Sequence, residues 1–171
     1  IERLPDGFYK LQNENGVIIL QRDGAGSIPA EVDHLFKGRK EWEELYRPRL
    51  QYSEERINAE LFQKLAQEDD RENPLGLYCG SLFGQIRDML GLEGVSYLYV
   101  DDEELYDEII DTIGELSYKC LERVLSFGVK FDFAHFWEDI AAKNGPLIIP
   151  SVFESKVGPH YRRITKLLNE H

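Results

Sequence analysis

The sequence predicts an α/β fold in which a β-hairpin near the N-terminus precedes parallel βαβ units. Two observations lead to this class. Residues 8–22 contain two extended apolar runs around a turn sequence, and from residue 74 onward short apolar runs alternate with long helical patterns. Strands and helices that alternate at these lengths are typical of parallel βαβ units, whose crossovers are right-handed.

The length, composition and net charge of the chain fit one domain and argue against nucleic acids and membranes as partners. The chain has 171 residues, of which 42% are hydrophobic, enough for a real core. Its formal net charge is -12, which argues against a nucleic-acid footprint and against an anionic membrane surface. No apolar window approaches the roughly 18 residues of a membrane span, and no signal peptide opens the chain.

The two cysteines, Cys79 and Cys120, are far apart and match no zinc-binding spacing. A chain without a disulfide framework suits a reducing compartment, so we expect a cytoplasmic protein.

The N-terminal region, residues 1–50, is predicted to be a β-hairpin followed by an irregular segment. Runs 8–12 and 17–22 flank "NENG", and Asn15-Gly16 can supply the positive φ of a tight turn. Short helical pieces such as 39–46 follow, and Pro48 should stop the last of them.

Residues 51–171 are predicted to supply the βα units. A helix over about 54–68 is capped by Ser53, and a short strand precedes Gly80. The next helix should end at Gly91, whereas "VSYLYV" fits either a strand or a helix.

The second half of this region follows the same alternation. Asp101 and Asp102 should open a long helix that ends at Gly128. The strand "VKFDFAHF" comes next, and a last helix begins at Ser151. The acidic run over 93–111 is best explained as the start of a helix, where carboxylates offset the dipole, with metal binding as the alternative.

Candidate functional side chains follow the predicted strands. In parallel α/β sheets and barrels, reactive groups lie just past the C-terminal ends of strands, where the sequence places Glu138 and Asp139, and also Gly80 and Ser81. A carboxylate there could bind a metal, accept a proton or hold a ring amide. The alternative is a helix N-terminus or a surface salt bridge. Only one of the two acids can point inward from an extended segment.

Three further residues carry two interpretations each. His135 could be a ligand or a core histidine. Arg87 could bind a ligand carboxylate through two hydrogen bonds, or pair with Asp88 on an exposed helix. Cys79 could be a thiolate nucleophile, although a buried thiol is the more common state of such a residue.

Several stretches resemble the uroporphyrinogen decarboxylase superfamily. "EDIAAKNGPLIIPSVFESKVGPHYRRITKLL" is similar to its strand end, Gly-Pro turn and following helix. Three more stretches resemble its methyltransferase-like branch: "GLYCGSLFGQIRDMLGLEGVSYLYVDDEELYDEIID", "SIPAEVDHLFKGRKEWEEL" and, for a β-hairpin insertion, "NGVIILQRDGAGS".

The resemblance implies a (β/α)8 (TIM) barrel, of which this chain would be a part. Such barrels need roughly 200 to more than 400 residues, so we expect a partial barrel with an N-terminal β-hairpin insertion, cut from a longer protein. The decarboxylase's "RQAGR"-like loop and aspartate segment are absent, as are the "HxC" and distant Cys that bind zinc in the methyltransferases. Arg87 and Asp139 replace a substrate-contacting Tyr and Ser of the decarboxylases.

By this resemblance the longer protein is a corrinoid-linked methyltransferase, with zinc and a corrinoid as its cofactors. The alternatives are a tetrapyrrole carboxy-lyase (uroporphyrinogen decarboxylase) and a non-catalytic module that binds a corrinoid or tetrapyrrole, either free or on a corrinoid protein. Asp139 and Glu138 are the expected catalytic residues. The isolated chain is expected to be inactive, without metal, and a homo-oligomer because a partial barrel leaves its sheet edges open. The expected substrate-binding residues are Arg87, Ser81, Gly80 and His135.

Overall fold

The computed structural model describes residues 1–26, 28–68 and 70–171. Its N-terminal part is an antiparallel sheet in the order β1-β2-β3-β4. The predicted hairpin is confirmed, because β2 (Phe8–Gln12) pairs with β3 (Val17–Arg22) and Gly16 turns the chain with φ of 81°. The outer strands, β1 (Glu2–Arg3) and β4 (Ala30–His34), were not predicted.

The segment after this sheet is a series of short helical turns: α1 (Arg39–Glu41), η1 (Trp42–Tyr46), η2 (Arg47–Leu50), η3 (Glu54–Arg56) and α2 (Ala59–Leu65). Two predictions are wrong here. Pro48 lies inside η2, near its start, where a missing N–H costs little. The helix expected over 54–68 is broken at Ile57, which is extended, so Asn58 rather than Ser53 caps α2 through Leu61 N–H at 3.1 Å.

The predicted parallel βαβ unit is confirmed in the second half of the chain. Strands β5 (Gly76–Tyr78) and β6 (Phe133–His135) pair in parallel, and the helices α3 (Phe83–Asp101) and α4 (Glu103–Leu125) connect them. A small antiparallel pair follows, β7 (Ala141–Ala142) with β8 (Gly145–Pro146). The described residues form separate small sheets of four, two and two strands and no closed barrel. The chain ends in α5 (Pro150–Val152), η4 (Phe153–Val157) and α6 (Gly158–Asn169).

The first helical stretch of α3 ends at Gly91, as expected, and a second helical stretch follows directly after this residue. Gly91 has φ of 72° inside the helix and produces a kink. The ring of His34, from the end of β4, packs against Gly91, where an added Cβ would lie 2.6 Å from the ring. The stretch "VSYLYV" is therefore helical, in the half of α3 beyond the kink.

Two apolar clusters make up the core. The larger one joins the segment around Trp42 to α3 and α4, and the indole and Ile109 in it are fully buried. The smaller one lies between the β5–β6 sheet and the helices α4 and α6, and includes Leu77, Cys79 and Ile164. One face of the parallel sheet is therefore covered by helices.

The acidic run fixes α4 to its neighbours. Asp102 caps the helix by accepting from Leu105 N–H at 2.9 Å, as expected for a helix start. Glu108 accepts from the Trp42 indole at 3.0 Å and pairs with Arg39 at 3.2 Å. Further along, acids of α4 meet bases of η4 and α6 one helical turn apart, in the pairs Lys156–Asp107, His160–Asp111 and Arg163–Glu115.

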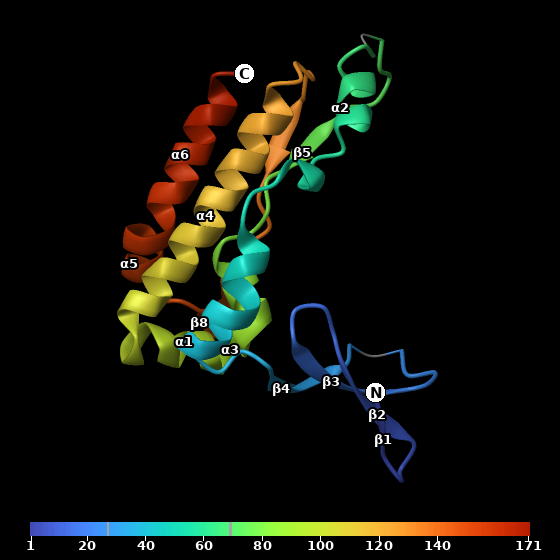
Figure 1. Ribbon diagram of the computed structural model, residues 1–171, viewed down its shortest axis with the longest axis vertical. Helices are drawn as coiled ribbons and strands as arrows, with labels where there is room; N and C mark the ends of the chain where they lie inside the picture. The colour runs from blue at the N-terminus through green and yellow to red at the C-terminus, as the bar shows by residue number, and fades with distance from the viewer. Residues whose placement is uncertain (27, 69) are drawn as a thin grey trace.

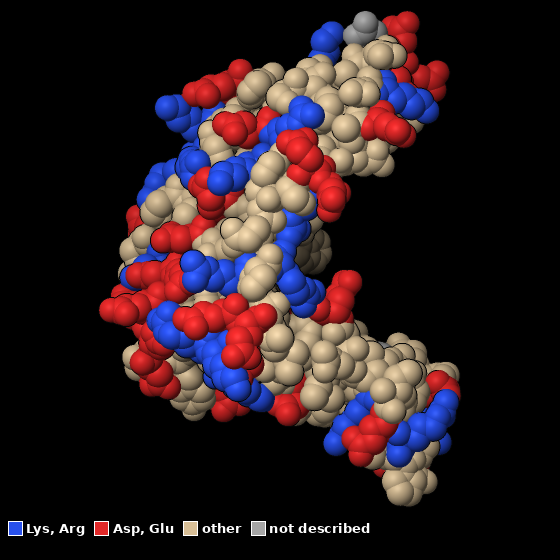
Figure 2. Space-filling view, viewed as in Figure 1, with Lys and Arg blue, Asp and Glu red and all other residues tan. Residues whose placement is uncertain are grey.

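The long helices α4 and α6 lie on one side of the parallel sheet, and the N-terminal sheet projects from the helical body (Figure 1). Figure 2 shows charged side chains crowded over α4, α5 and α6, and a hollow between α2 and the N-terminal sheet. The strands β5 and β6 themselves contain no Lys, Arg, Asp or Glu.

The kink at Gly91 can be tested by adding a methyl group. We predict that Gly91→Ala lowers the free energy of unfolding by about 3 kcal/mol, because essentially only glycine adopts this backbone conformation, which costs other residues about 1–3 kcal/mol, and because the Cβ meets the His34 ring. Gly128→Ala is the matched control, since Gly128 has φ of 76° with nothing within 4 Å. Equal losses in urea unfolding of both variants would show that the His34 contact is absent.

Candidate functional site

The C-terminal ends of β5 and β6 bring several predicted site residues together. Gly80 and Ser81 follow β5, and Glu138 and Asp139 follow β6. The Ser81 hydroxyl donates to Glu138 Oε2 at 3.0 Å, although the two residues are far apart in the sequence. Parallel pairing places both strand ends at the same edge, which is why the sequence could predict this grouping.

Glu138 closes the N-terminus of α3. Its Oε1 accepts from the N–H groups of Leu82 and Phe83 at 2.8 and 3.1 Å, and its Oε2 accepts from Gly84 N–H at 2.9 Å. The first N–H groups of a helix have no partner within the helix, and a carboxylate suits the positive end of the dipole. Glu138 thus caps α3 from a distant strand, which is the helix N-terminus that the sequence left as its alternative role.

Tyr161 of α6 completes this cap. Its hydroxyl donates to Glu138 Oε1 and also lies 3.2 Å from Leu82 N. Burial, together with the hydrogen bond to the Glu138 carboxylate, raises the pKa of Tyr161 above its usual range. The phenol therefore remains a donor at any ordinary pH, and the carboxylate is surrounded by donors from β5, α3 and α6.

Asp139 and Arg87 form a second, more exposed pair. Arg87 Nη1 lies 2.5 Å from Asp139 Oδ2 and 3.3 Å from the Asp139 carbonyl oxygen, while Nη2 lies 3.1 Å from Asp88. Glu138 and Asp139 therefore turn to different partners, as expected for neighbours on an extended segment. Arg87 is a cation at the rim of the strand ends, where a ligand carboxylate could reach it.

The other predicted residues have separate positions. Gly80, with φ of 85°, accepts from Trp137 N–H at 3.0 Å through its carbonyl and shapes the turn. His135 is exposed and lies beside Tyr78 rather than beside Glu138. Cys79 is buried, and burial raises the pKa of its thiol to about 11, which favours a core thiol over a nucleophile.

An exposed aromatic face lies on the side of β5 and β6 opposite to the helices α4 and α6. We call Tyr78, Phe133, His135 and Trp137 the aromatic face. The side chains of Tyr78, Phe133 and Trp137 are 57%, 51% and 69% exposed. The His135 ring centroid lies 5.3 Å from that of Tyr78 and 6.1 Å from that of Phe133. Large exposed rings grouped in this way commonly mark a binding surface.

Sequence reasoning missed the aromatic face and Tyr161. The alternation of "FDFAH" placed Phe133 and His135 on the same face of a strand, but it could not tell which face the helices would cover. No local signal linked Tyr161 to Glu138, because that contact depends on how α6 packs.

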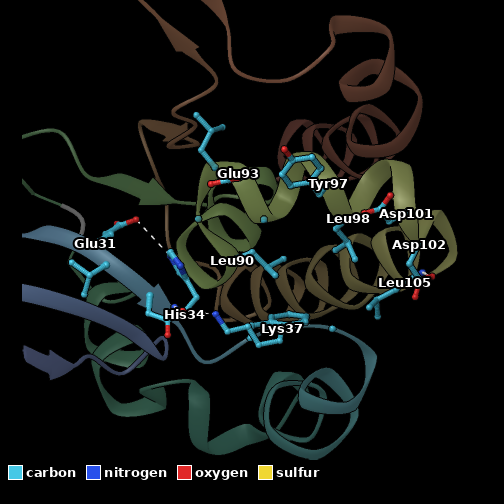
Figure 3. A pocket seen from close by; sticks show the side chains of 17 residues that line it. Glu31, His34, Lys37, Leu90, Glu93, Tyr97, Leu98, Asp101, Asp102 and Leu105 are labelled. Carbon is cyan, nitrogen blue, oxygen red and sulfur yellow. Dashed lines mark hydrogen bonds and ion pairs between the residues drawn. The ribbon is translucent and has the colours of Figure 1, made fainter.

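A cavity of about 710 Å³, separate from the strand ends, lies between β4 and the kinked helix α3 (Figure 3). It contains none of the predicted site residues. Its walls carry the carboxylates of Glu31, Asp33, Glu93, Asp101 and Asp102, with Lys37 paired to Asp33. A surface of this charge repels anionic ligands, so the strand ends remain the candidate site for a ligand with carboxylates.

Within the described residues, no three or more His, Cys, Asp or Glu side chains are grouped so that they could hold a metal ion. The helices of the described part of the chain include none with the length and apolar character needed to span a membrane. Comparisons with protein-family models, with curated proteins and with solved structures found no match.

The two acids should differ in what they do for stability. We predict that Glu138→Gln lowers the free energy of unfolding by about 2 kcal/mol, because an amide cannot accept all these bonds and leaves buried donors without partners. Asp139→Asn, which weakens an exposed ion pair, should cost less than about 1 kcal/mol. Urea unfolding of both variants gives the comparison, and a larger loss for Asp139→Asn would contradict the assignment of Glu138 as the cap.

Proposed function

We propose that the chain is part of a barrel enzyme that resembles the uroporphyrinogen decarboxylase superfamily, and that the aromatic face binds a planar macrocycle bearing carboxylates. One observation carries this proposal. Exposed rings lie on the open face of two parallel strands, and a cation stands at their C-terminal ends. The partial-barrel interpretation agrees with the parallel pair β5–β6 and its helices, since barrels are built from such units.

The aromatic face suits a flat apolar ligand. Tyr78, Phe133 and Trp137 expose much of their rings to water, and covering apolar surface is favourable by roughly 25 cal/mol per Å². Offset stacking of a macrocycle on these rings adds to that term. A corrinoid or a tetrapyrrole is large enough to cover several of these side chains at once.

Arg87 gives the site its preference for carboxylates. Its guanidinium is held in place by Asp139 and Asp88, and a planar guanidinium can bind a carboxylate through two parallel hydrogen bonds. A carboxylate of the ligand would take the place of Asp139, leaving that acid free beside the bound ring. This is the role in which Asp139 could act as a general acid or base.

Between the two enzymatic branches, we favour corrinoid-linked methyl transfer. Arg87 and Asp139 stand where the resemblance places a substrate-contacting Tyr and Ser in decarboxylases, so a different ligand is favoured at the same site. Catalytic zinc usually takes about three protein ligands, and the described residues do not fit such a site. We therefore assign no zinc chemistry to the described residues of this chain.

A module that binds the macrocycle without chemistry is the second candidate. The observation that favours it is the engagement of Glu138, whose oxygens accept from α3, Ser81 and Tyr161. A carboxylate held in this way is poorly placed to transfer protons to a ligand. The isolated chain would then bind its ligand without turnover.

Absorption titrations with hydroxocobalamin and with uroporphyrin test the site directly. We expect micromolar binding of at least one of them. Tyr78→Ala should lower the affinity for the bound compound by about tenfold, and Arg87→Ala should do so for uroporphyrin, because cobalamin carries amides in place of carboxylates. Tyr97→Ala is the matched control, because Tyr97 is 61% exposed on α3, away from the aromatic face.

The absence of a spectral change with both compounds would contradict the proposal. So would equal losses in Tyr78→Ala and Tyr97→Ala, which would show that the ligand adheres to exposed rings in general. Loss of binding to uroporphyrin alone in Arg87→Ala would identify the carboxylates as what Arg87 recognises.

A further inference from the structure

The edge of strand β6 that faces away from β5 has Ala134 at its centre. Cys79 N–H donates to the carbonyl of His135 at 2.9 Å, so His135 directs its polar backbone groups toward β5. Alternate residues of a strand direct these groups to opposite sides. Ala134, which pairs in register with Leu77, therefore directs both its N–H and its carbonyl away from β5. Its side chain is exposed and small.

A groove of about 360 Å³ with a mixed apolar and polar lining runs along this edge. Leu77, Phe131, Phe136 and Leu168 contribute its apolar lining, and Thr165, Asn169 and His171 contribute polar groups. Free strand edges beside apolar surface pair readily with another strand. The edge thus offers both the hydrogen bonds and the apolar surface that a docked strand needs.

The charges on the chain and around the groove determine which kind of partner the groove can accept. The chain carries a formal net charge of -12, so two copies repel each other over most of their surfaces. Among the described residues that line the groove, Asp132 is the only acidic side chain, and it lies 2.7 Å from Leu75 N and 3.6 Å from Arg71. A basic partner would find no free carboxylate here, whereas a second copy would meet no unpaired like charge.

We propose that two copies of this chain pair through β6, antiparallel about a twofold axis that passes beside Ala134. In an antiparallel ladder, two directly opposed residues can exchange both of their N–H···O bonds. A single residue with both groups free is therefore complementary to itself, and twofold symmetry places one Ala134 opposite the other. The short alanine side chains leave room for the two strands to approach.

The dimer would contain a four-stranded sheet in the order β5-β6-β6-β5. The aromatic faces of the two copies would then lie on the same side of that sheet and next to each other. The pairing uses the edge of β6 and not the rings on its face, and it applies to the 171-residue chain, because in a closed barrel this edge would pair with the next barrel strand instead.

Sedimentation equilibrium of the 171-residue chain over micromolar concentrations tests the pairing. We expect a mass that rises toward twice the 19.9 kDa of one chain. Ala134→Pro removes the N–H from both copies, and so both exchanged bonds, and should raise the dissociation constant by about tenfold or more. Ala134→Ser keeps the N–H and the small size, and should leave the dissociation constant nearly unchanged.

Amide hydrogen exchange of the wild-type chain provides a measurement that does not depend on a variant's folding. We expect the Ala134 N–H to exchange more slowly as the protein concentration rises, while the exposed N–H of Val32 in β4 does not change. A monomer at all concentrations, an unaltered dimer in folded Ala134→Pro, or exchange at Ala134 that is independent of concentration would each overturn the proposal.

Discussion

The carboxylate of Glu138 holds the architecture together at the place where the strands end. It accepts from three backbone N–H groups at the start of α3, from the Ser81 hydroxyl and from Tyr161 of α6. Strand β6, helix α3 and helix α6 therefore meet at one side chain. Replacing these bonds would require water at a position that the packing of Phe136 and Tyr161 partly excludes.

This contact determines which side of the parallel sheet is open. With α6 fixed at its start by Tyr161, the helix packs its buried side chains Ile164 and Leu167 behind β5 and β6, together with Leu121 of α4. The salt bridges between α4 and α6 lie on the outer surface of the same layer. On the opposite face of the sheet, away from α4 and α6, Tyr78 and Phe133 are exposed, and Arg87 pairs with Asp139 just past the end of β6.

Local features of the sequence were enough to predict the turn at Asn15-Gly16, the Asp102 cap and the parallel pair β5–β6. Each depends on neighbours in the sequence or on the alternation of short and long segments. The helix end at Gly91 was predictable, because a glycine with positive φ usually ends a helix, whereas the sequence left open whether a strand or a helix follows. The packing of His34 against Gly91 depends on tertiary structure.

The grouping of some site residues could be predicted as well, because it follows from the order of strands and helices along the chain. Chain order brought Ser81, Glu138 and Asp139 to one edge, whereas the pairing of Arg87 with Asp139 was not predicted. The roles of the two acids could not be predicted, because the donors to Glu138 come from residues 54 to 57 positions earlier in the chain and from α6. Likewise, the exposure of Tyr78 and His135 depends on which face of the sheet the helices occupy.

The coupling between Glu138 and Tyr161 is the most direct test of the cap on which this arrangement depends. A double-mutant cycle of Glu138→Gln, Tyr161→Phe and the combined variant, measured by urea unfolding, isolates the interaction between the two side chains. We predict a coupling of about 1 kcal/mol or more, because the hydrogen bond joins a partly buried phenol to a carboxylate. Losses that add to within about 0.3 kcal/mol would mean that the two side chains act independently and that Glu138 does not tie α6 to α3.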